Sequence, residues 1–132
     1  MLGIYNLRKK NLILACLGVL LLPSLAFAHA HLKGAEPGKD AKLAQAPSGV
    51  TLHFSEKLEL AMCKIEVKNL DTGAVISEPK SIEAAPDGST LHVSLKPLPN
   101  EKAKFQVNWK AVARDSHSMK GSYEFSIVPK AP

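Results

Sequence analysis

The sequence predicts an all-β protein, a small antiparallel sandwich or barrel of about seven strands. Apolar and polar residues alternate with a period of two along five separate segments, as expected for strands with one buried face. Clusters of proline, glycine, asparagine and aspartate separate these segments at the spacing typical of such folds. No stretch of ten or more residues carries an apolar stripe at helical spacing. Together these observations favour strands throughout.

Each expected strand combines an apolar row with turn residues at its ends. The first and the fourth strands are only weakly patterned; they end before Pro37-Gly38 and begin after Asp71-Thr72-Gly73, respectively. The other five have clear rows of large apolar residues at alternate positions. In chain order the seven expected strands lie near residues 32–35, 50–54, 65–67, 74–77, 91–95, 105–109 and 123–127.

The N-terminal segment has the three-part layout of a secretory signal peptide. Three basic residues at positions 8–10 precede an uncharged apolar run over residues 12–22. Ala26-Phe27-Ala28 then offers small residues at the two positions that signal peptidase recognises. The apolar run is shorter than the roughly 20 residues that span a bilayer, which disfavours the alternative of a retained membrane anchor. We therefore expect residues 1–28 to be removed on export, leaving residues 29–132 as a single exported domain.

Removal of this segment changes what the charge and the cysteines imply. The chain of 132 residues has 17 Lys and Arg against 12 Asp and Glu, a net charge of +5. Three basic residues leave with the segment, so 14 remain against 12 acidic residues, a difference of 2, and they are scattered. Nucleic-acid binding needs clustered basic residues and is therefore excluded. Cys16 leaves as well, so Cys63 cannot form an internal disulfide and is expected to be a small buried residue.

Cleavage would make His29 the first residue of the mature chain. Its free α-amine and its imidazole Nδ1 can close a chelate ring on one metal ion, and such nitrogen donors suit Cu(II). Asp115-Ser116-His117 offers a carboxylate and a second imidazole, which an extended segment would place on one side. These groups can form a square-planar set for one Cu(II) ion. The alternative for Asp115-Ser116-His117 is a polar loop without a metal.

His31 supports a competing arrangement. In His29-Ala30-His31 the amine, two deprotonated amides and the third-residue imidazole can enclose Cu(II) or Ni(II) without help from the fold. The other interpretations of His31 are an outward strand residue or a group that orients a metal ligand. His53 and His92 lie on outward rows of expected strands, so we interpret them as surface residues.

Five segments follow one another in a distinctive order: His29-Ala30-His31-Leu32, Leu52-His53-Phe54-Ser55-Glu56, Val107-Asn108-Trp109-Lys110-Ala111-Val112, Asp115-Ser116-His117 and Gly121-Ser122-Tyr123-Glu124-Phe125. This order and spacing resemble the CopC family of periplasmic copper-resistance proteins, and the likeness covers essentially all of residues 29–132. The resemblance implies a seven-stranded Greek-key β-barrel of immunoglobulin or cupredoxin-like type. It also implies Cu(II) binding by His29, Asp115 and His117, with Glu56 as a residue that orients a ligand.

The methionine content departs from that of some members of this family. Those members carry a methionine-rich loop that binds Cu(I), since thioether sulfur favours the reduced ion. Here only Met62 and Met119 remain in residues 29–132, and neither lies in residues 71–85, so no Cu(I) site is expected. Met119 lies two residues past His117 and is a candidate axial ligand.

The resemblance implies a non-enzymatic Cu(II) carrier or buffer, a monomer that passes its copper to an inner-membrane transporter. One alternative is a copper monooxygenase that uses a histidine brace, but the short chain and its inward-facing aromatic residues argue against a substrate platform. The other alternative is a structural β-sandwich whose metal binding is limited to the N-terminal tripeptide.

Overall fold

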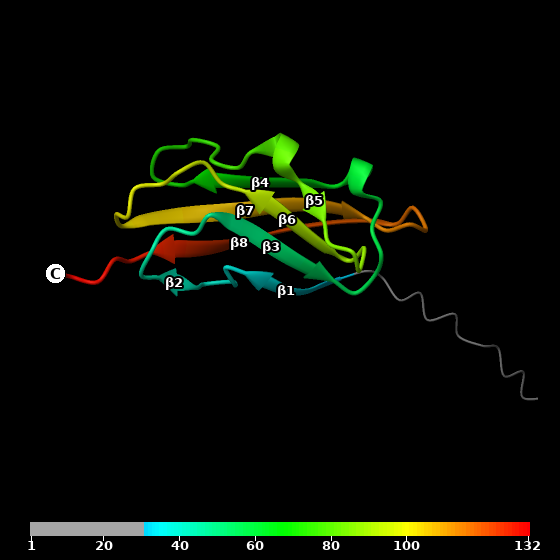
Figure 1. Cartoon of the computed structure of the whole chain (residues 1–132), viewed down its shortest axis with the longest axis horizontal. Coiled ribbons are helices and arrows are strands. Elements are labelled where there is room, and N and C mark those ends of the chain that lie inside the picture. The colour runs from blue at the N-terminus through cyan, green and yellow to red at the C-terminus, as the bar shows by residue number, and fades with distance from the viewer. Residues whose placement is uncertain (1–30) are drawn as a thin grey trace, which may run out of the picture.

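The computed structural model describes residues 31–132, which form two four-stranded sheets packed as a sandwich (Figure 1). Sheet I has the order β1-β3-β6-β5 and consists of β1 (Leu32–Glu36), β3 (Gly49–Phe54), β6 (Thr90–Ser94) and β5 (Glu83–Ala84). Sheet II has the order β2-β8-β7-β4 and consists of β2 (Lys42–Leu43), β8 (Ser118–Ile127), β7 (Ala103–Val112) and β4 (Lys64–Asn69). Two short 3-10 turns, η1 (Leu60–Met62) and η2 (Pro79–Ser81), lie in the connections. The expected signal segment and His29 lie outside the described residues.

The core lies between the two sheets and consists of the alternating apolar rows. Val50, Leu52 and Phe54 of β3 are buried, and the outward residues between them are not. On sheet II the rings of Phe105 and Phe125 stack with their centroids 5.2 Å apart. This burial confirms the all-β prediction and the period-two pattern on which it depends. Within residues 31–132, no helix has the length and apolar character needed to cross a membrane.

The weak strand expected near residues 74–77 does not form. Val75 makes an isolated bridge to Lys68 at the end of β4 in sheet II, whereas Ser77 bridges Leu95 just after β6 in sheet I. The segment therefore crosses from one sheet to the other and pairs with each only once, so no ladder develops. The buried Ser77 hydroxyl accepts a hydrogen bond from the backbone N–H of Val67 at 3.0 Å, which satisfies it within the core. The two-residue strands β2 and β5 are too short to produce an alternating pattern and were not expected.

Cys63 is buried and free, as the sequence predicted. Its thiol donates a hydrogen bond to the carbonyl of Glu59 at 3.3 Å, and burial raises its pKa above that of an ordinary thiol. Met62, the preceding residue, is exposed, so the two sulfur atoms do not form a common soft-metal site.

Native protein at pH 8 should therefore resist alkylation at Cys63 by iodoacetamide, because the thiolate is both scarce and inaccessible. Mass spectrometry of the peptide that contains Cys63 checks this result. The matched control is the same protein in guanidinium chloride, where the peptide should become fully labelled. Rapid labelling of folded protein would contradict the prediction.

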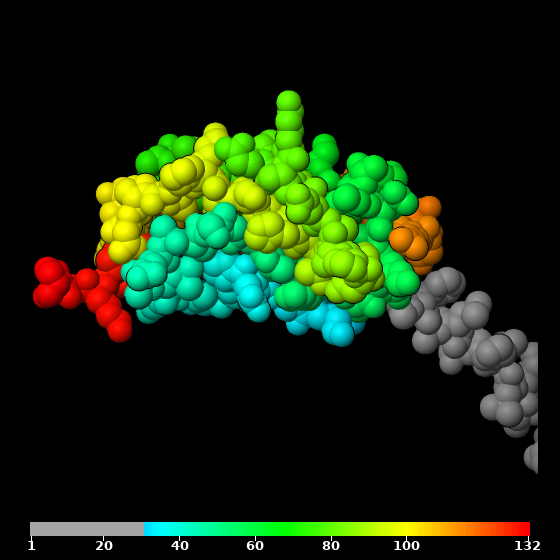
Figure 2. Space-filling model, viewed as in Figure 1, coloured from blue at the N-terminus to red at the C-terminus, as the bar shows by residue number. Residues whose placement is uncertain are grey.

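Three segments meet at one end of the sandwich: the start of β1, the connection from β3 to β4, and the turn between β7 and β8 (Figure 1). Leu58 in the β3–β4 connection bridges Ala113, and the N–H of Arg114 donates to the carbonyl of Lys57 at 3.1 Å. Figure 2 shows the orange β7–β8 turn at the surface of this end, beside the green β3–β4 connection, and the C-terminus lies at the opposite end. The fold therefore brings the entry of the chain into β1 to the end that carries Asp115 and His117.

Candidate metal centre

The turn between β7 and β8 corrects the expectation that Asp115-Ser116-His117 is extended. β7 and β8 pair along their whole lengths, and past their ends the N–H of Ala113 donates to the carbonyl of His117 at 2.9 Å. The N–H of Ser116 donates to the carbonyl of Ala113 at 2.9 Å, and Ser116 has a φ of 74°, in the left-handed region used in tight turns. The segment is thus the tip of a hairpin, because two long antiparallel strands must be joined by a chain reversal.

Asp115 and His117 contact each other across this tip. Nδ1 of His117 lies 2.9 Å from Oδ2 of Asp115, and the backbone N–H of His117 donates to Oδ1 at 3.1 Å. These two hydrogen bonds from His117 hold the pKa of the Asp115 carboxyl below its usual value, so the group is ionised at neutral pH. An ionised carboxylate only accepts hydrogen bonds, so Nδ1 carries a hydrogen and Nε2 is the ring atom suited to a metal.

The donor chemistry of this pair fits copper. Histidines that bind metals commonly donate their other ring N–H to a carboxylate, which fixes the ring and raises its basicity. Both side chains are about half exposed, at 53% for Asp115 and 54% for His117, so the pair lies at the surface of the protein. Imidazole nitrogen and carboxylate oxygen are donors that Cu(II) accepts.

A complete site needs donors beyond this pair. Within residues 31–132, no group of three or more His, Cys, Asp or Glu side chains is placed to hold a metal ion. His29, the expected source of an amine and an imidazole, lies outside the described residues. The structure therefore brings together Asp115 and His117 from the predicted set, and does not add His31 to them.

His31 is fixed beside the end of β3. Its N–H donates to Oγ of Ser55 at 2.9 Å, and the N–H of Ser55 donates to the carbonyl of His31 at 3.0 Å. These reciprocal bonds set His31 opposite Ser55 at the edge of sheet I, with an exposed side chain. Sequence reasoning missed Ser55, because a serine that hydrogen-bonds across a strand pair has no characteristic spacing.

Glu56 and Met119 occupy different environments. Glu56 is half-buried in the β3–β4 connection, which lies against the hairpin through the bond from Arg114 to Lys57. Met119 pairs with Ala111 in the β7–β8 ladder, and its partly buried side chain packs on the hydrophobic core. The thioether is therefore engaged in packing below the hairpin tip.

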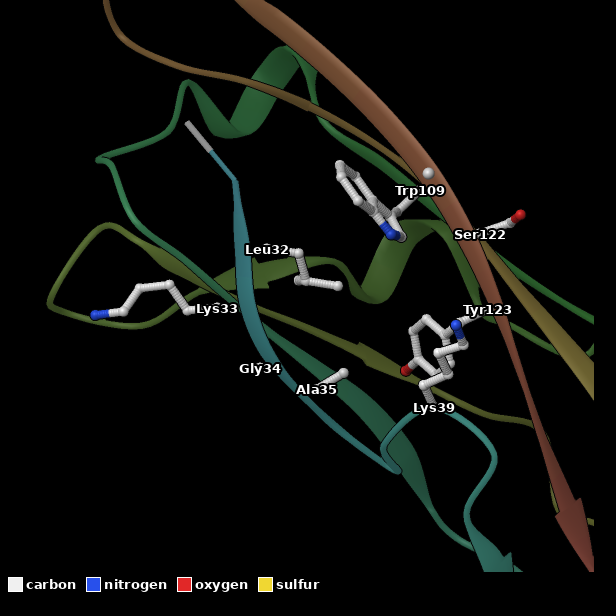
Figure 3. A pocket seen from close by; sticks show the side chains of 9 residues that line it. Leu32, Lys33, Gly34, Ala35, Lys39, Trp109, Ser122 and Tyr123 are labelled. Atoms are coloured by element: carbon white, nitrogen blue, oxygen red, sulfur yellow. The ribbon is translucent and has the colours of Figure 1, made fainter. Parts of the chain in front are cut away.

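Trp109 lines a pocket of about 300 Å³ between β1 and β8 (Figure 3). It was expected on an inward row, but it is only half-buried. Its indole makes an edge contact with Phe54, at a centroid distance of 5.2 Å, and covers Gly121. A Cβ on Gly121 would lie 2.6 Å from Cζ2 of Trp109, so the glycine is required for this packing. The alternation of apolar and polar residues could not reveal the pocket, because the pocket depends on Gly121 in the neighbouring strand β8, which has no side chain.

Comparisons with known proteins agree on one family. Residues 32–128 match the CopC domain. The chain is 30% identical to protein YobA of Escherichia coli K12, with 91% of this chain and 95% of that protein covered, and 30% identical to copper resistance protein C of Escherichia coli, with 77% and 83% covered. It is also 31% identical to the copper transport protein CutJ of Bacillus subtilis over 91% of this chain, but it spans only 22% of the length of CutJ.

Solved structures give the same assignment. CopC from Methylosinus trichosporium OB3b aligns with a TM-score of 0.69 at 25% identity, covering 79% of this chain and 98% of that one. PcoC, a methionine-rich copper resistance protein from Escherichia coli, shares the fold with a TM-score of 0.63 at 24% identity, covering 76% and 100%. The family match argues against the monooxygenase alternative, because the matched relatives are named as copper resistance and copper transport proteins. The chain therefore belongs to the CopC family of copper-resistance proteins.

Proposed function

We propose that this protein is a periplasmic carrier or buffer that binds one Cu(II) ion through His29, Asp115 and His117. The observation that carries the proposal is the contact between Nδ1 of His117 and Oδ2 of Asp115 at the hairpin tip. This contact holds an imidazole nitrogen and a negative charge close together, as a cation site requires. Both lie at the end of the sandwich where the chain enters β1. His29 lies two residues before the first described residue, within a short reach of the same end.

The ligand roles follow from the chemistry of each group. His29 would supply the α-amine and its imidazole, and His117 would supply Nε2. The ionised Asp115 would hold the His117 ring and offset part of the charge of the ion. Copper bound by such nitrogen and oxygen donors would be held in the Cu(II) state, for which tetragonal nitrogen and oxygen coordination is favourable.

The remaining candidates have supporting or alternative roles. Glu56 is suited to orient an imidazole, because the β3–β4 connection that carries it is hydrogen-bonded to the β7–β8 hairpin. We omit Met119 from the ligand set, since its side chain packs on the core. The local arrangement of the His29 amine, two amides and His31 stays the main alternative, and it would leave Asp115 and His117 outside the site.

The cellular role rests on residues 1–28. Their signal-like layout supports export to the periplasm and cleavage before His29, with residues 29–132 as the mature domain. We further propose that the mature protein is a monomer and passes copper to an inner-membrane transporter. The name of CutJ, a copper transport protein that contains a matching segment within a longer chain, supports this partner.

Adding one alanine before His29 of the mature protein is expected to lower Cu(II) affinity by more than tenfold, because the α-amine would move away from the His29 imidazole. A competition titration against a coloured Cu(II) chelator measures the change. The matched control is the same alanine added after Pro132, at the far end of the sandwich, which should leave the affinity unchanged. Unaltered tight binding by the N-terminally extended protein would contradict both the brace and the tripeptide arrangement.

A further inference from the structure

Lysines that are scattered along the sequence gather on the outer face of sheet II. Alternate residues of its long strands are buried in the core, and the residues between them point outward. The strand register places these outward residues side by side. The charged residues among them are lysines and two glutamates: Lys42, Lys64, Lys68, Lys104, Lys110, Lys120, Glu66 and Glu124. This face is therefore basic, although basic and acidic residues nearly balance over residues 29–132.

Three of these lysines form a row across three strands. Lys64 of β4 is directly opposite Lys110 of β7, and Lys110 is directly opposite Lys120 of β8. Adjacent strands lie about 4.8 Å apart, so the row spans about 10 Å. All three side chains are exposed, and within residues 31–132 none of them forms an ion pair. The acidic residue on the adjoining rung is Glu66, two residues from Lys64 on the same strand. We call these three residues the lysine row.

The lysine row opposes folding. Like charges directly opposite each other in a sheet are destabilising, and here two such pairs share Lys110. A neutral polar residue at any of the three positions would remove repulsion at no cost to the core. Surface patterns that lower stability without a compensating contact are characteristic of functional sites. The row therefore indicates a partner that carries negative charge.

An exposed apolar turn adjoins the lysine row. None of the residues of η1 is buried, and Leu60 and Met62 are 37% and 56% exposed. Met62 precedes Lys64 by two residues. The N–H of Glu59 donates to the carbonyl of Val112 at 2.8 Å, which holds the turn against the end of β7. Figure 1 shows η1 as the green coil at the start of β4, at the same end of the sandwich as the β7–β8 turn.

This combination fits the surface of an anionic membrane better than it fits an acidic protein. Protein–protein interfaces are enriched in arginine, whose planar fork matches a carboxylate, and depleted in lysine. The row contains lysine only. A lysine ammonium is a point charge without a fixed binding geometry, and a surface of lipid phosphates attracts it. Apolar side chains beside such charges can enter the boundary between headgroups and acyl chains.

We propose that the lysine row and η1 form a docking surface for a phospholipid membrane with anionic headgroups. The three ammonium groups contact lipid phosphates, and Leu60 and Met62 enter the interface. Binding is reversible, since each lysine near an anionic surface contributes only about fivefold in affinity.

The docking surface lies close to the hairpin tip. The last pair of the β7–β8 ladder is Val112 with Ser118, one rung beyond the pair of Lys110 with Lys120, which is about 7 Å along the strands. A docked molecule therefore holds its hairpin end near the membrane surface. The docking surface includes none of the proposed copper ligands, so the two proposals can be tested separately.

Cosedimentation with vesicles tests the docking surface in the protein of residues 29–132, which contains the whole core. Vesicles of phosphatidylglycerol mixed with phosphatidylcholine should bind the protein, and vesicles of phosphatidylcholine alone should not. Binding should fall at least tenfold between about 0.05 M and about 0.5 M salt, because the screening length becomes shorter than the row. Equal binding to both kinds of vesicle, absence of binding to either, or binding that salt does not weaken would overturn the proposal.

Glutamine at all three positions of the lysine row should weaken binding to the anionic vesicles at least tenfold. The matched control places glutamine at Lys80, Lys96 and Lys130, which are exposed lysines outside the strands of sheet II, and removes the same charge. It should weaken binding less than fivefold. An equal loss in both proteins would show that net charge alone attracts the protein, and this result would refute the docking surface.

The double variant Leu60→Ser and Met62→Ser distinguishes a membrane from an acidic protein. Both side chains are exposed, so the variant should fold, and it should bind the anionic vesicles severalfold more weakly because less apolar surface leaves water. Soluble poly-glutamate serves as the protein-like probe. If the variant bound both the vesicles and poly-glutamate as tightly as the wild type does, the row would be a site for acidic proteins and the membrane proposal would be wrong.

Stability and copper binding provide two further readouts for the row variant. Its midpoint of urea unfolding should equal or exceed that of the wild type, because the substitutions relieve repulsion. A lower midpoint would show that the lysines serve the fold and would contradict the proposal. Its Cu(II) affinity should be unchanged, and a tenfold fall would assign the row to the copper centre instead. Failure of vesicle binding leaves the proposed copper function unaffected.

Discussion

Replacing His117 with alanine is expected to lower Cu(II) affinity by more than tenfold, because the substitution removes an imidazole that the fold has already oriented. The 2.9 Å contact with Asp115 orients the ring, which lowers the entropic cost of ordering this side chain on binding. Ligands and the residues that orient them typically change metal affinity by 10–100-fold when they are removed. A competition titration on the mature protein measures the effect.

Two further variants show whether the loss is specific. His92→Ala removes an exposed imidazole from the outer face of sheet I and should leave the Cu(II) affinity unchanged. Asp115→Asn keeps the shape of the carboxylate but removes its charge, so the affinity should fall by less than in His117→Ala. Equal affinity in wild type and His117→Ala would instead favour the tripeptide arrangement that ends at His31.

Replacing Phe54 with alanine is expected to reduce the free energy of unfolding by about 3–5 kcal/mol, as for other large-to-small core substitutions. Phe54 is 3% exposed, and its ring packs edge-on against Trp109 of sheet II at a centroid distance of 5.2 Å. The cavity would therefore open between the sheets, next to the pairing of Phe54 with Leu32 that holds β1 in place. Urea denaturation followed by the fluorescence of Trp109 measures the change.

Leu60→Ala is the matched control for this core variant. Leu60 lies in η1 at the same end of the sandwich but is 37% exposed, so its truncation should alter stability by only about 0.5 kcal/mol. A loss below about 1 kcal/mol for Phe54→Ala would show that the contact between the two sheets at this end is weaker than its burial implies.

The sequence predicted the fold where burial alone decides the structure. Apolar and polar residues alternate along β3 and β8 because one face of each strand meets the core. This pattern is local, so the sequence alone predicts it. Residues 74–77 have similar apolar content, but their pairing is divided between Lys68 and Leu95. Which strands a segment meets depends on tertiary arrangement, and a period of two carries no information about it.

The candidate site was predictable in composition but not in geometry. Asp115 and His117 were chosen for their donor atoms, and the structure confirms that they contact each other. Their hairpin conformation depends on a left-handed serine, Ser116, at a position where glycine or asparagine would have signalled a turn. The hydrogen bond between His53 and Thr90 joins residues 37 positions apart. It depends on the register of β3 and β6, so neither strand's own sequence predicts it.

The exposure of the hairpin tip has a kinetic consequence for the proposed carrier. Asp115 and His117 are each about half exposed at the turn between two strands of ten residues, so an incoming donor can approach a bound ion without any movement of the sandwich. Copper would then leave by stepwise ligand exchange, in which each new donor enters before an old one departs. The transfer rate would rise with the concentration of the acceptor and would not be limited by spontaneous release, so a carrier could bind copper tightly and still deliver it quickly.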